Sequence, residues 1–483
     1  MSTQQVRALW KDGKTAEALV EAWRAYDAAP HGNDEKYYVA RLLREDPELF
    51  TADRVDNLRT LLSDPKIDPS TISGAGWRHL LRDTDLFAPG RDAAAMAAEF
   101  ETNALVLTLL TEDCVAAHRA ETALTQVRRW LLLEDRWRDF PKLSEALAAQ
   151  AALNEGAWLF DAEERARLAE APQAIRRAYL PDRPGPAEAG AFDHAVTRAV
   201  AAQYEGWPYP AWRRVLAAPP SSLAKDVRGR DPDGPDTIPT PADILIAGCG
   251  TGRQTAMIAL RYPKDHLTSI DISEASLAYA RERCAASGLS GIEFRILDLH
   301  AVETLGRQFD AILCTGVLHH LPDPEAGWEA LNRVLRPGGV MHVMVYSRVA
   351  RMRIMAWRKA LGDLTRRTVD DDLLREIRGR LMALPQSAIP KNRDFQTLAG
   401  VHDLLMHRHE DPFDIPRIRR ALERMGLELI QFELPTAKIR AAYRANHPDD
   451  PLRRDYAGWT EMERKDPSMF AAMYDLWCRK PLA

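Results

Sequence analysis

The chain has 483 residues, a formal net charge of −5 and an apolar fraction of 46%. This length exceeds one ordinary hydrophobic core and predicts two or three domains, while the mixed charges exclude an overall field that would draw the protein to nucleic acid or an anionic membrane. No stretch reaches the roughly 20 apolar residues that cross a bilayer, and no signal-peptide core opens the chain, so we expect a cytoplasmic protein without membrane association. The five scattered cysteines argue against a disulfide framework and a structural zinc site.

The N-terminal region predicts an all-helical domain over residues 1–180, because Ala, Leu, Arg and Glu dominate it at helical spacing. Its opening segment, with Ala8, Gly13 and Ala18, resembles one tetratricopeptide unit, in which small residues let two helices pack closely. An ordinary helical hairpin is the alternative. A helical domain of this kind favours a protein partner or a macromolecular substrate.

Residues 181–240 read as a linker that is rich in proline and glycine. A short helix is predicted near residues 195–203. The aromatic and proline-rich segment after it, YEGWPYPAW, cannot be a regular helix. Its residues Tyr204, Tyr209 and Trp212 are candidates for substrate contact, and packing between domains is the alternative.

From Asp243 onward, short apolar runs alternate with helical patterns, which is typical of a parallel sheet covered by helices. The first run, ILIAG, leads into a turn that must bend sharply and admit a ligand close to the backbone. A dinucleotide-binding loop would place its third glycine where Arg253 stands, so a nicotinamide oxidoreductase is disfavoured. The observed spacing resembles motif I of class I S-adenosylmethionine-dependent methyltransferases, and it nominates as cofactor residues Gly248, Cys249, Gly250 and Gly252.

Acidic residues end the next two predicted strands. Asp271 follows the run LTSI, where a carboxylate can accept both ribose hydroxyls of a nucleoside, and Ile272 would pack on the adenine. Asp298 and Leu299 follow the run IEFRIL, where the resemblance implies contacts with the adenine edge. The alternatives are a helix N-terminal acid for Asp271 and a turn former for Asp298.

The fourth and fifth strands carry the closest resemblance. FDAILCTGVLHHLPDP and LNRVLRPGG match the corresponding motifs of class I methyltransferases nearly residue for residue, and they add Thr315 and Gly316 to the implied cofactor site. The resemblance implies a seven-stranded Rossmann-like sheet with an antiparallel seventh strand over residues 241–483, and S-adenosyl-L-methionine as cofactor. A wider similarity, to bacterial methyltransferases with a tetratricopeptide-like N-terminal region, rests on QYEGWPYPAW, AGCGTG, DISEASLAYA, GVLHHLPDP and MYDLWCRKP.

The C-terminal part predicts a helix over residues 415–425, a sixth strand over 427–433 and a seventh over 473–479. Helical insertions at about 349–385 and 435–470 are candidates for a substrate lid near the carboxyl ends of the strands. Three residues, Tyr346, Arg348 and Arg351, are candidate substrate contacts, because an arginine cluster can hold a carboxylate or phosphate. A solvated helix face is the alternative for this cluster. No metal site is expected, since the histidines near residue 407 lack a supporting ligand set.

Methyl transfer to oxygen or to an acidic carbon is helped by a general base, and His319 and His320 are the candidates because imidazole ordinarily titrates in the useful range. Capping of the turn before Pro322 is the alternative role. The motif after strand four differs from those of amide, adenine and arginine methyltransferases, which leaves a protein side chain or a small-molecule oxygen or carbon acceptor. The competing hypothesis is an inactive methyltransferase-fold scaffold that binds a protein partner through its N-terminal helices.

Overall fold

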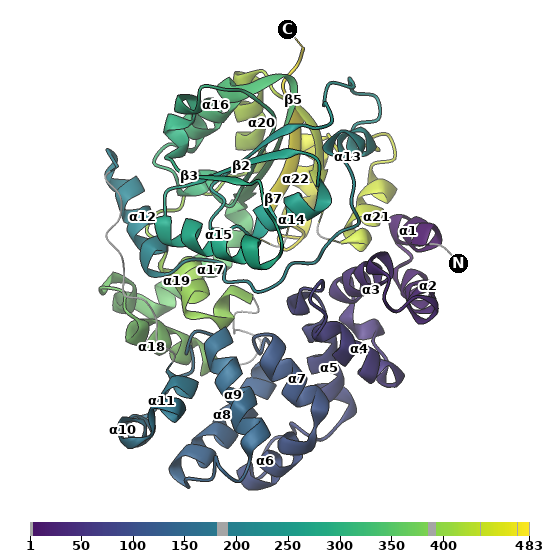
Figure 1. The fold of residues 1–483 in the computed structure, drawn as a ribbon. Helices are drawn as coiled ribbons and strands as arrows, with labels where there is room; N and C mark the ends of the chain where they lie inside the picture. Colours follow the sequence, from purple (N-terminus) through teal and green to yellow (C-terminus); the bar gives the residue numbers. More distant parts are fainter. Residues whose placement is uncertain (1–2, 181–191, 385–392, 435, 471, 483) are drawn as a thin grey trace. The chain divides into compact units, whose positions relative to one another are not determined.

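The computed structural model describes residues 3–180, 192–384, 393–434, 436–470 and 472–482 (Figure 1). The chain forms two compact units. The first unit gathers residues 1–9, 14–184 and 357–406, and the second gathers residues 10–13, 185–356 and 407–483. This division differs from the domain boundaries expected from the sequence, because residues 357–384 were expected to lie within the catalytic part and instead pack with the N-terminal helices.

The described part of the first unit is helical, as its composition predicts. Its helices are α2 (Thr15–Ala28), α3 (Asn33–Glu45), α4 (Val55–Leu62), α5 (Ser73–Asp83), α6 (Ala93–Thr102), α7 (Ala104–Glu112), α8 (His118–Leu133), α9 (Pro141–Leu153), α10 (Ala162–Glu170), α11 (Gln173–Tyr179), α18 (Asp371–Met382) and α19 (Leu398–Met406). Helices α1 (Thr3–Lys11) and α17 (Arg348–Leu361) contribute residues to both units. Helix α1 ends before Gly13, whose φ of +79° makes the turn into α2. The tetratricopeptide resemblance of this pair stays a prediction.

A buried ion pair joins the two sequence segments of the first unit. Arg378 on α18 donates to both carboxylate oxygens of Glu121 on α8, at 2.5 and 2.7 Å, and also to the carbonyl of Phe395 at 2.9 Å. Arg378 is 4% exposed and Glu121 also 4% exposed. Because a buried charge needs a partner, this pair holds α18 against α8 within the helical unit.

Among the described residues, no single helix is long and apolar enough to cross a membrane. The consecutive helices α6 and α7 reach that length and composition only together, and they are bent by 87° at the break between them.

The second unit is built on a seven-stranded sheet in the order β3-β2-β1-β4-β5-β7-β6 (Figure 1). The strands are β1 (Asp243–Ala247), β2 (His266–Asp271), β3 (Glu293–Ile296), β4 (Phe309–Thr315), β5 (Leu335–Tyr346), β6 (Glu428–Glu433) and β7 (Met473–Arg479). The first five strands are parallel, whereas β7 runs antiparallel to both β5 and β6. The predicted fold class is therefore confirmed, including the antiparallel seventh strand.

Helices cover both faces of this sheet. They are α12 (Ala195–Gly206), α13 (Leu223–Arg230), α14 (Arg253–Arg261), α15 (Glu274–Ala286), α16 (Pro324–Val334), α20 (Ile415–Met425), α21 (Ala437–Asn446) and α22 (Tyr456–Lys465). The 3-10 helices of the two units are η1 (Pro47–Leu49), η2 (Ala52–Arg54), η3 (Pro69–Thr71), η4 (Leu299–Leu305), η5 (Leu318–His320), η6 (Gly362–Arg366) and η8 (Arg393–Gln396). Alternating residues of β1 face opposite sides: Ile244 and Ile246 pack with α13 and α15, whereas Leu245 and Ala247 belong to the core with α16, α20 and α22.

Strand β6 is an edge of the sheet, and arginine side chains cover its outer carbonyl groups. Arg454 donates to the carbonyl of Ile430 at 2.8 Å and Arg453 to that of Phe432 at 3.0 Å. Just after the strand, Arg440 donates to the carbonyl of Leu434 at 3.2 Å. Covered edges resist pairing with a further strand.

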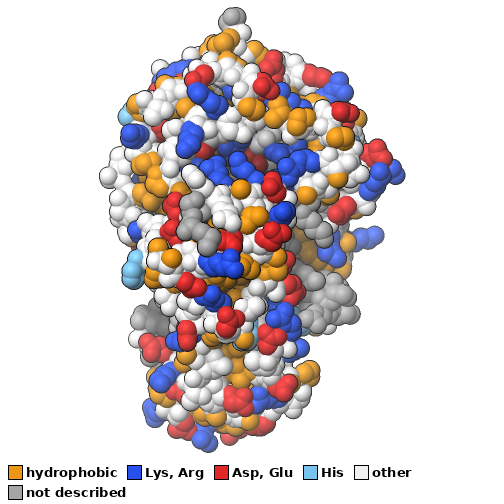
Figure 2. All heavy atoms as spheres, turned by 90° about the vertical axis from the view of Figure 1, so that its right-hand side faces the viewer, with side chains coloured by type: hydrophobic (Ala, Val, Ile, Leu, Met, Phe, Trp, Pro, Cys, Tyr) orange, Lys and Arg blue, Asp and Glu red, His pale blue; other side chains and the backbone are white. Residues whose placement is uncertain are grey.

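Basic side chains are interspersed with acidic ones on the face shown in Figure 2, as the sequence composition leads one to expect.

Candidate functional site

The glycine-rich loop between β1 and α14 is shaped by backbone conformations that favour glycine. Gly248, Gly250 and Gly252 have φ of +69°, +52° and +79°. A Cβ on Gly248 would lie 2.3 Å from Val317, and a Cβ on Gly252 would lie 2.6 Å from Ala280 on α15. These glycines therefore let neighbouring elements approach the loop. Cys249, expected in the cofactor site, is buried, and its amide donates to the carbonyl of Ile270 at 3.0 Å.

Asp271 joins the loops that follow β1 and β2. Its Oδ2 accepts from the amide of Gly250 at 2.7 Å, and its Oδ1 accepts from the amide of Ser273 at 3.0 Å. Burial raises the pKa of the Asp271 carboxyl and the charge of Glu205 adds to that effect, while the backbone donors oppose it. A carboxylate keeps further lone pairs when it accepts two amides, so Asp271 can still take hydroxyl donors. Ile272 beside it is half-buried.

Asp298 and Leu299 follow β3 as predicted, but their side chains have different surroundings. Asp298 accepts from the amide of His300 at 2.9 Å and faces its Nδ1 at 3.0 Å. Burial opposes ionisation of Asp298, yet the His300 hydrogen bonds outweigh it and lower the carboxyl pKa. Leu299 is 4% exposed and lies in the core beside α16. Only Asp298 of this pair therefore offers a polar side chain.

The end of β4 is tied to its neighbours on both sides. Thr315 donates through Oγ1 to Oε1 of Gln254 on α14 at 2.9 Å. Gly316 has a φ of +77°, and its amide donates to the carbonyl of Met344 on β5 at 2.9 Å. The carboxyl ends of β1, β2, β4 and β5 thus meet at one edge of the sheet with Asp271 and Thr315, which is where ligands bind in open α/β sheets.

Two histidines form a buried aromatic cluster after β4. His319 is fully buried, and its Nδ1 accepts from the backbone amide of Tyr346 at 3.1 Å, so the proton of its neutral ring lies on Nε2. That Nε2 is buried and has no hydrogen-bond partner among the described residues. His320 donates through Nδ1 to the carbonyl of His409 at 2.9 Å and stacks on His407 at 3.6 Å between ring centroids.

The prediction that these two histidines titrate in the range useful for a general base is wrong. Burial lowers the pKa of His320 to about 3 and lowers the pKa of His319 well below its ordinary value. Both rings are therefore neutral near pH 7 and are weak bases, because desolvation penalises the charged imidazolium. Sequence reasoning assumed an exposed imidazole and could not anticipate this burial.

The aromatic and proline-rich segment contacts the loop after β1 and the start of α15 directly. Trp212 is 5% exposed and donates through Nε1 to the carbonyl of Thr251 at 2.8 Å, which places it in packing rather than in substrate contact. The carbonyl of Tyr209 would lie 3.1 Å from a Cβ on Gly250. Tyr204 is half-buried and its hydroxyl lies 3.2 Å from Nε2 of His407. Glu205, which sequence reasoning missed, is 6% exposed and accepts from the amides of Glu274 and Ala275.

The two candidate arginines occupy different environments. Arg351 is 3% exposed, pairs with Glu410 and places its guanidinium 4.3 Å from the ring centre of Tyr346. Arg348 is exposed and donates to the carbonyl of Pro412 at 3.0 Å. The solvated-face alternative holds for Arg348, whereas Arg351 belongs to the buried cluster around Tyr346.

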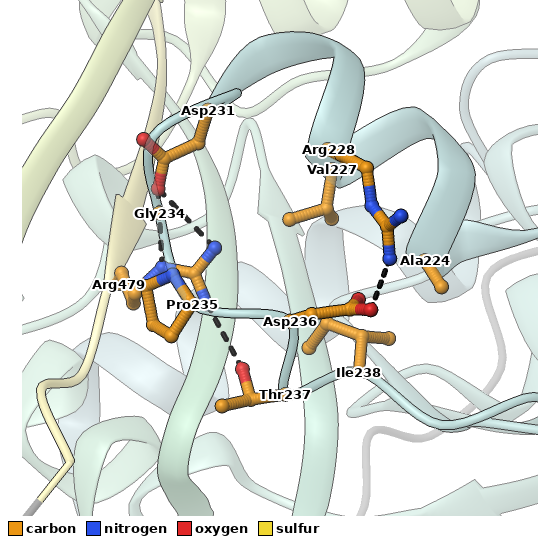
Figure 3. Close-up of a pocket in the computed structure, with 10 residues that line it drawn as sticks. All are labelled: Ala224, Val227, Arg228, Asp231, Gly234, Pro235, Asp236, Thr237, Ile238 and Arg479. Atoms are coloured by element: carbon orange, nitrogen blue, oxygen red, sulfur yellow. Dashed lines mark hydrogen bonds and ion pairs between the residues drawn. The ribbon is translucent and has the colours of Figure 1, made fainter.

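A small hollow lies at the opposite edge of the sheet (Figure 3). Arg479, at the end of β7, pairs there with Asp231 at 3.2 Å and donates to the carbonyl of Gly338 at 2.9 Å. Thr237 accepts from the same guanidinium at 3.0 Å. Because Gly338 lies near the start of β5, this hollow is at the amino edge of the parallel strands, away from the glycine-rich loop. Its ion pair fastens residues 231–238 to the sheet.

Comparison with known proteins gives the family. Residues 244–339, from β1 into β5, match the family described as Methyltransferase domain. The chain carries a class I S-adenosylmethionine-dependent methyltransferase domain. This domain spans the glycine-rich loop, Asp271, Asp298 and the histidine motif, so the resemblance expected from the sequence is confirmed.

Several relatives match parts of the chain. An uncharacterized protein from Synechococcus sp. is 34% identical over 260 residues, which cover 50% of this chain and 61% of the relative. A ubiquinone biosynthesis O-methyltransferase from Pseudomonas putida is 34% identical over 114 residues, which cover 23% of this chain and 48% of the relative. The chain thus spans less than two thirds of either relative. The solved structure of PKMT2 from Rickettsia typhi in complex with AdoHcy has a TM-score of 0.41 at 16% identity, with 54% of each chain covered.

Proposed function

We propose that this protein is an S-adenosylmethionine-dependent methyltransferase that acts at the carboxyl edge of its sheet. The observation that carries the proposal is the position of Asp271, whose carboxylate joins the glycine-rich loop to the loop after β2. This arrangement supports nucleoside recognition, because the same group can accept ribose hydroxyls.

Residues from three loops would hold the cofactor. Asp271 would accept the ribose hydroxyls, Ile272 would pack on the adenine, and Asp298 would face the adenine edge. Gly250 adds a backbone without a side chain, and among the described residues the carbonyl oxygen of Tyr209 lies nearest to its Cβ position, at 3.1 Å. When bound, S-adenosylmethionine supplies a methyl group activated by its sulfonium. The protein's own task is then to orient the acceptor and to keep water away.

The buried histidines favour an acceptor that needs little help from a base. His319 and His320 are weak bases because burial lowers the pKa of both rings. The Nε2–H of His319 is a buried donor, so it offers no base to an acceptor either. We therefore favour an oxygen acceptor that is already ionised, such as a carboxylate, on a small molecule or on a protein. The oxygen acceptor implied by the name of the Pseudomonas putida relative agrees with this choice.

Calorimetry tests the cofactor directly. Micromolar binding of S-adenosylmethionine and S-adenosylhomocysteine, without binding of NADH, is the expected result. A labelled-methyl reaction with cell extract, separated into protein and small-molecule fractions, then identifies the acceptor class. If neither sulfur compound binds, the proposal is wrong, and an inactive scaffold that binds a protein partner through its N-terminal helices becomes the better hypothesis.

A further inference from the structure

The segment from Tyr204 to Trp212, here called the strap, contacts two cofactor loops of the second unit. It includes the end of α12 and lies against the glycine-rich loop, although about forty residues separate Trp212 from that loop in the sequence.

Glu205 holds the start of α15. Its Oε1 accepts from the amide of Glu274 at 2.6 Å, and its Oε2 accepts from the amide of Ala275 at 3.1 Å. Ser273 accepts from the amide of Ser276 at 3.1 Å. The first three amides of α15 are thereby satisfied, and the carboxylate also complements the positive end of the helix dipole. Only two residues separate Asp271 from the start of α15 at Glu274.

Trp212 and its neighbours hold the glycine-rich loop. The indole Nε1 of Trp212 donates to the carbonyl of Thr251 at 2.8 Å, and the Thr251 hydroxyl donates to the carbonyl of Pro210 at 2.5 Å. Tyr279 on α15 donates through its hydroxyl to the carbonyl of Trp212 at 2.6 Å and accepts from its amide at 3.0 Å. The strap therefore bonds both to the loop after β1 and to the helix after β2.

Asp271 also joins the glycine-rich loop to the start of α15. Its carboxylate bonds to Gly250, next to Thr251, and to Ser273, next to Glu274. A displacement of either element would move one of the two amides that orient this carboxylate. Binding groups lose effect when their geometry loosens by a fraction of an ångström, so supporting contacts of this kind set affinity.

We propose that Glu205 and Trp212 are positioning residues for the cofactor site: by fastening the strap to both loops they set the affinity for the S-adenosyl cofactor. Neither residue needs to touch the cofactor for this role. The inference rests on the proposed function, because it concerns the strength of cofactor binding.

Two matched controls separate positioning from general stability. Glu101 accepts from the amides of Lys142 and Leu143 at the start of α9, at 3.2 and 2.8 Å, so this half-buried carboxylate holds two successive helix amides in the first unit as Glu205 does in the second. Trp459 is fully buried and donates through Nε1 to the carbonyl of Arg453 at 3.0 Å, which repeats the bond of Trp212 away from the glycine-rich loop.

The experiment measures the Kd of S-adenosylhomocysteine and the thermal midpoint of the full chain for Glu205→Gln, Trp212→Phe, Glu101→Gln and Trp459→Phe. Loss of one hydrogen bond should weaken binding by about fivefold to tenfold in each strap variant. The control variants should stay within about twofold of the wild-type Kd, because their bonds support other elements. Glu205→Ala, which loses both acceptor oxygens, should bind more weakly than Glu205→Gln.

Strap variants that keep the wild-type Kd would overturn the proposal, and so would controls that weaken binding as much as the strap variants do. Absence of binding by the wild-type protein would overturn the proposed function and the strap proposal together. Wild-type binding with unchanged strap variants would overturn the strap proposal alone.

Discussion

Replacing Gly252 with alanine should destabilise the second unit through two separable effects. The backbone at this residue has a φ of +79°, which costs a non-glycine residue about 1–2 kcal/mol. The added Cβ would lie 2.6 Å from the Cβ of Ala280, whereas carbon atoms in contact lie about 3.5–4.0 Å apart. Helix α15 would have to move by about 1 Å, and crowding of this kind costs about 1–3 kcal/mol. The expected total is about 2–5 kcal/mol.

A double-mutant cycle with Ala280→Gly isolates the crowding. Ala280→Gly alone should cost about 1 kcal/mol, because glycine is a poor helix residue. In the Gly252→Ala background it should instead recover stability, which gives a coupling of about 1–3 kcal/mol between the two positions. Gly288→Ala is the control for φ alone, since Gly288 has a φ of +73° and no atom of the described residues lies within 4 Å of its Cβ position.

Urea denaturation gives the free energies of unfolding for this cycle, and calorimetry with S-adenosylhomocysteine reports whether the loop keeps its shape. Gly252→Ala should weaken cofactor binding, and the double variant should regain part of it. Additive free energies would refute the steric account of Gly252, and so would a Gly288→Ala variant that costs as much as Gly252→Ala.

Three further predictions concern single charged or titratable groups. Asp271→Asn should weaken binding of S-adenosylhomocysteine by about 10- to 100-fold in calorimetry while the circular dichroism spectrum stays unchanged, because hydrogen bonds to a charged acceptor are lost; retained affinity would place the site elsewhere. His320 is neutral in the fold with a pKa of about 3, but protonates near pH 6.5 when unfolded, so the free energy of unfolding should fall as the pH drops below 6.5. Protonation of unfolded His320 lowers the free energy of unfolding by about 2 kcal/mol at pH 5. In urea denaturation, His320→Gln should therefore lose about 2 kcal/mol less than the wild-type protein between pH 7 and pH 5. Arg378→Met leaves the Glu121 carboxylate buried without its partner and should cost about 3–5 kcal/mol in the same assay, whereas adding Glu121→Leu should recover most of the loss; an unrecovered double variant would contradict this account.

Local signals in the sequence were sufficient for the sheet and for the order of its motifs. Helix α20 begins and ends at the predicted residues because Asp414 caps its first turn and Gly426 ends it with a φ of +65°. Strand β7 also has its predicted bounds, because a short apolar run is a local signal that does not depend on which elements it packs against. Asp271 was identifiable because the end of a strand next to a glycine-rich turn has a defined place in a parallel sheet.

Only the tertiary structure decided which distant residues surround those motifs. Burial, which depends on all neighbouring elements, turned His319 and His320 from ordinary titrating imidazoles into neutral rings. Glu205 lies within the segment QYEGWPYPAW, but its role depends on α12 ending beside α15, which that segment alone does not indicate. Likewise, residues 357–406 join the N-terminal helices through the Arg378–Glu121 pair, whose members are 257 residues apart. Periodicity and capping act over a few residues and are legible in the chain, whereas desolvation and long-range pairing arise only when the folded chain brings its segments together.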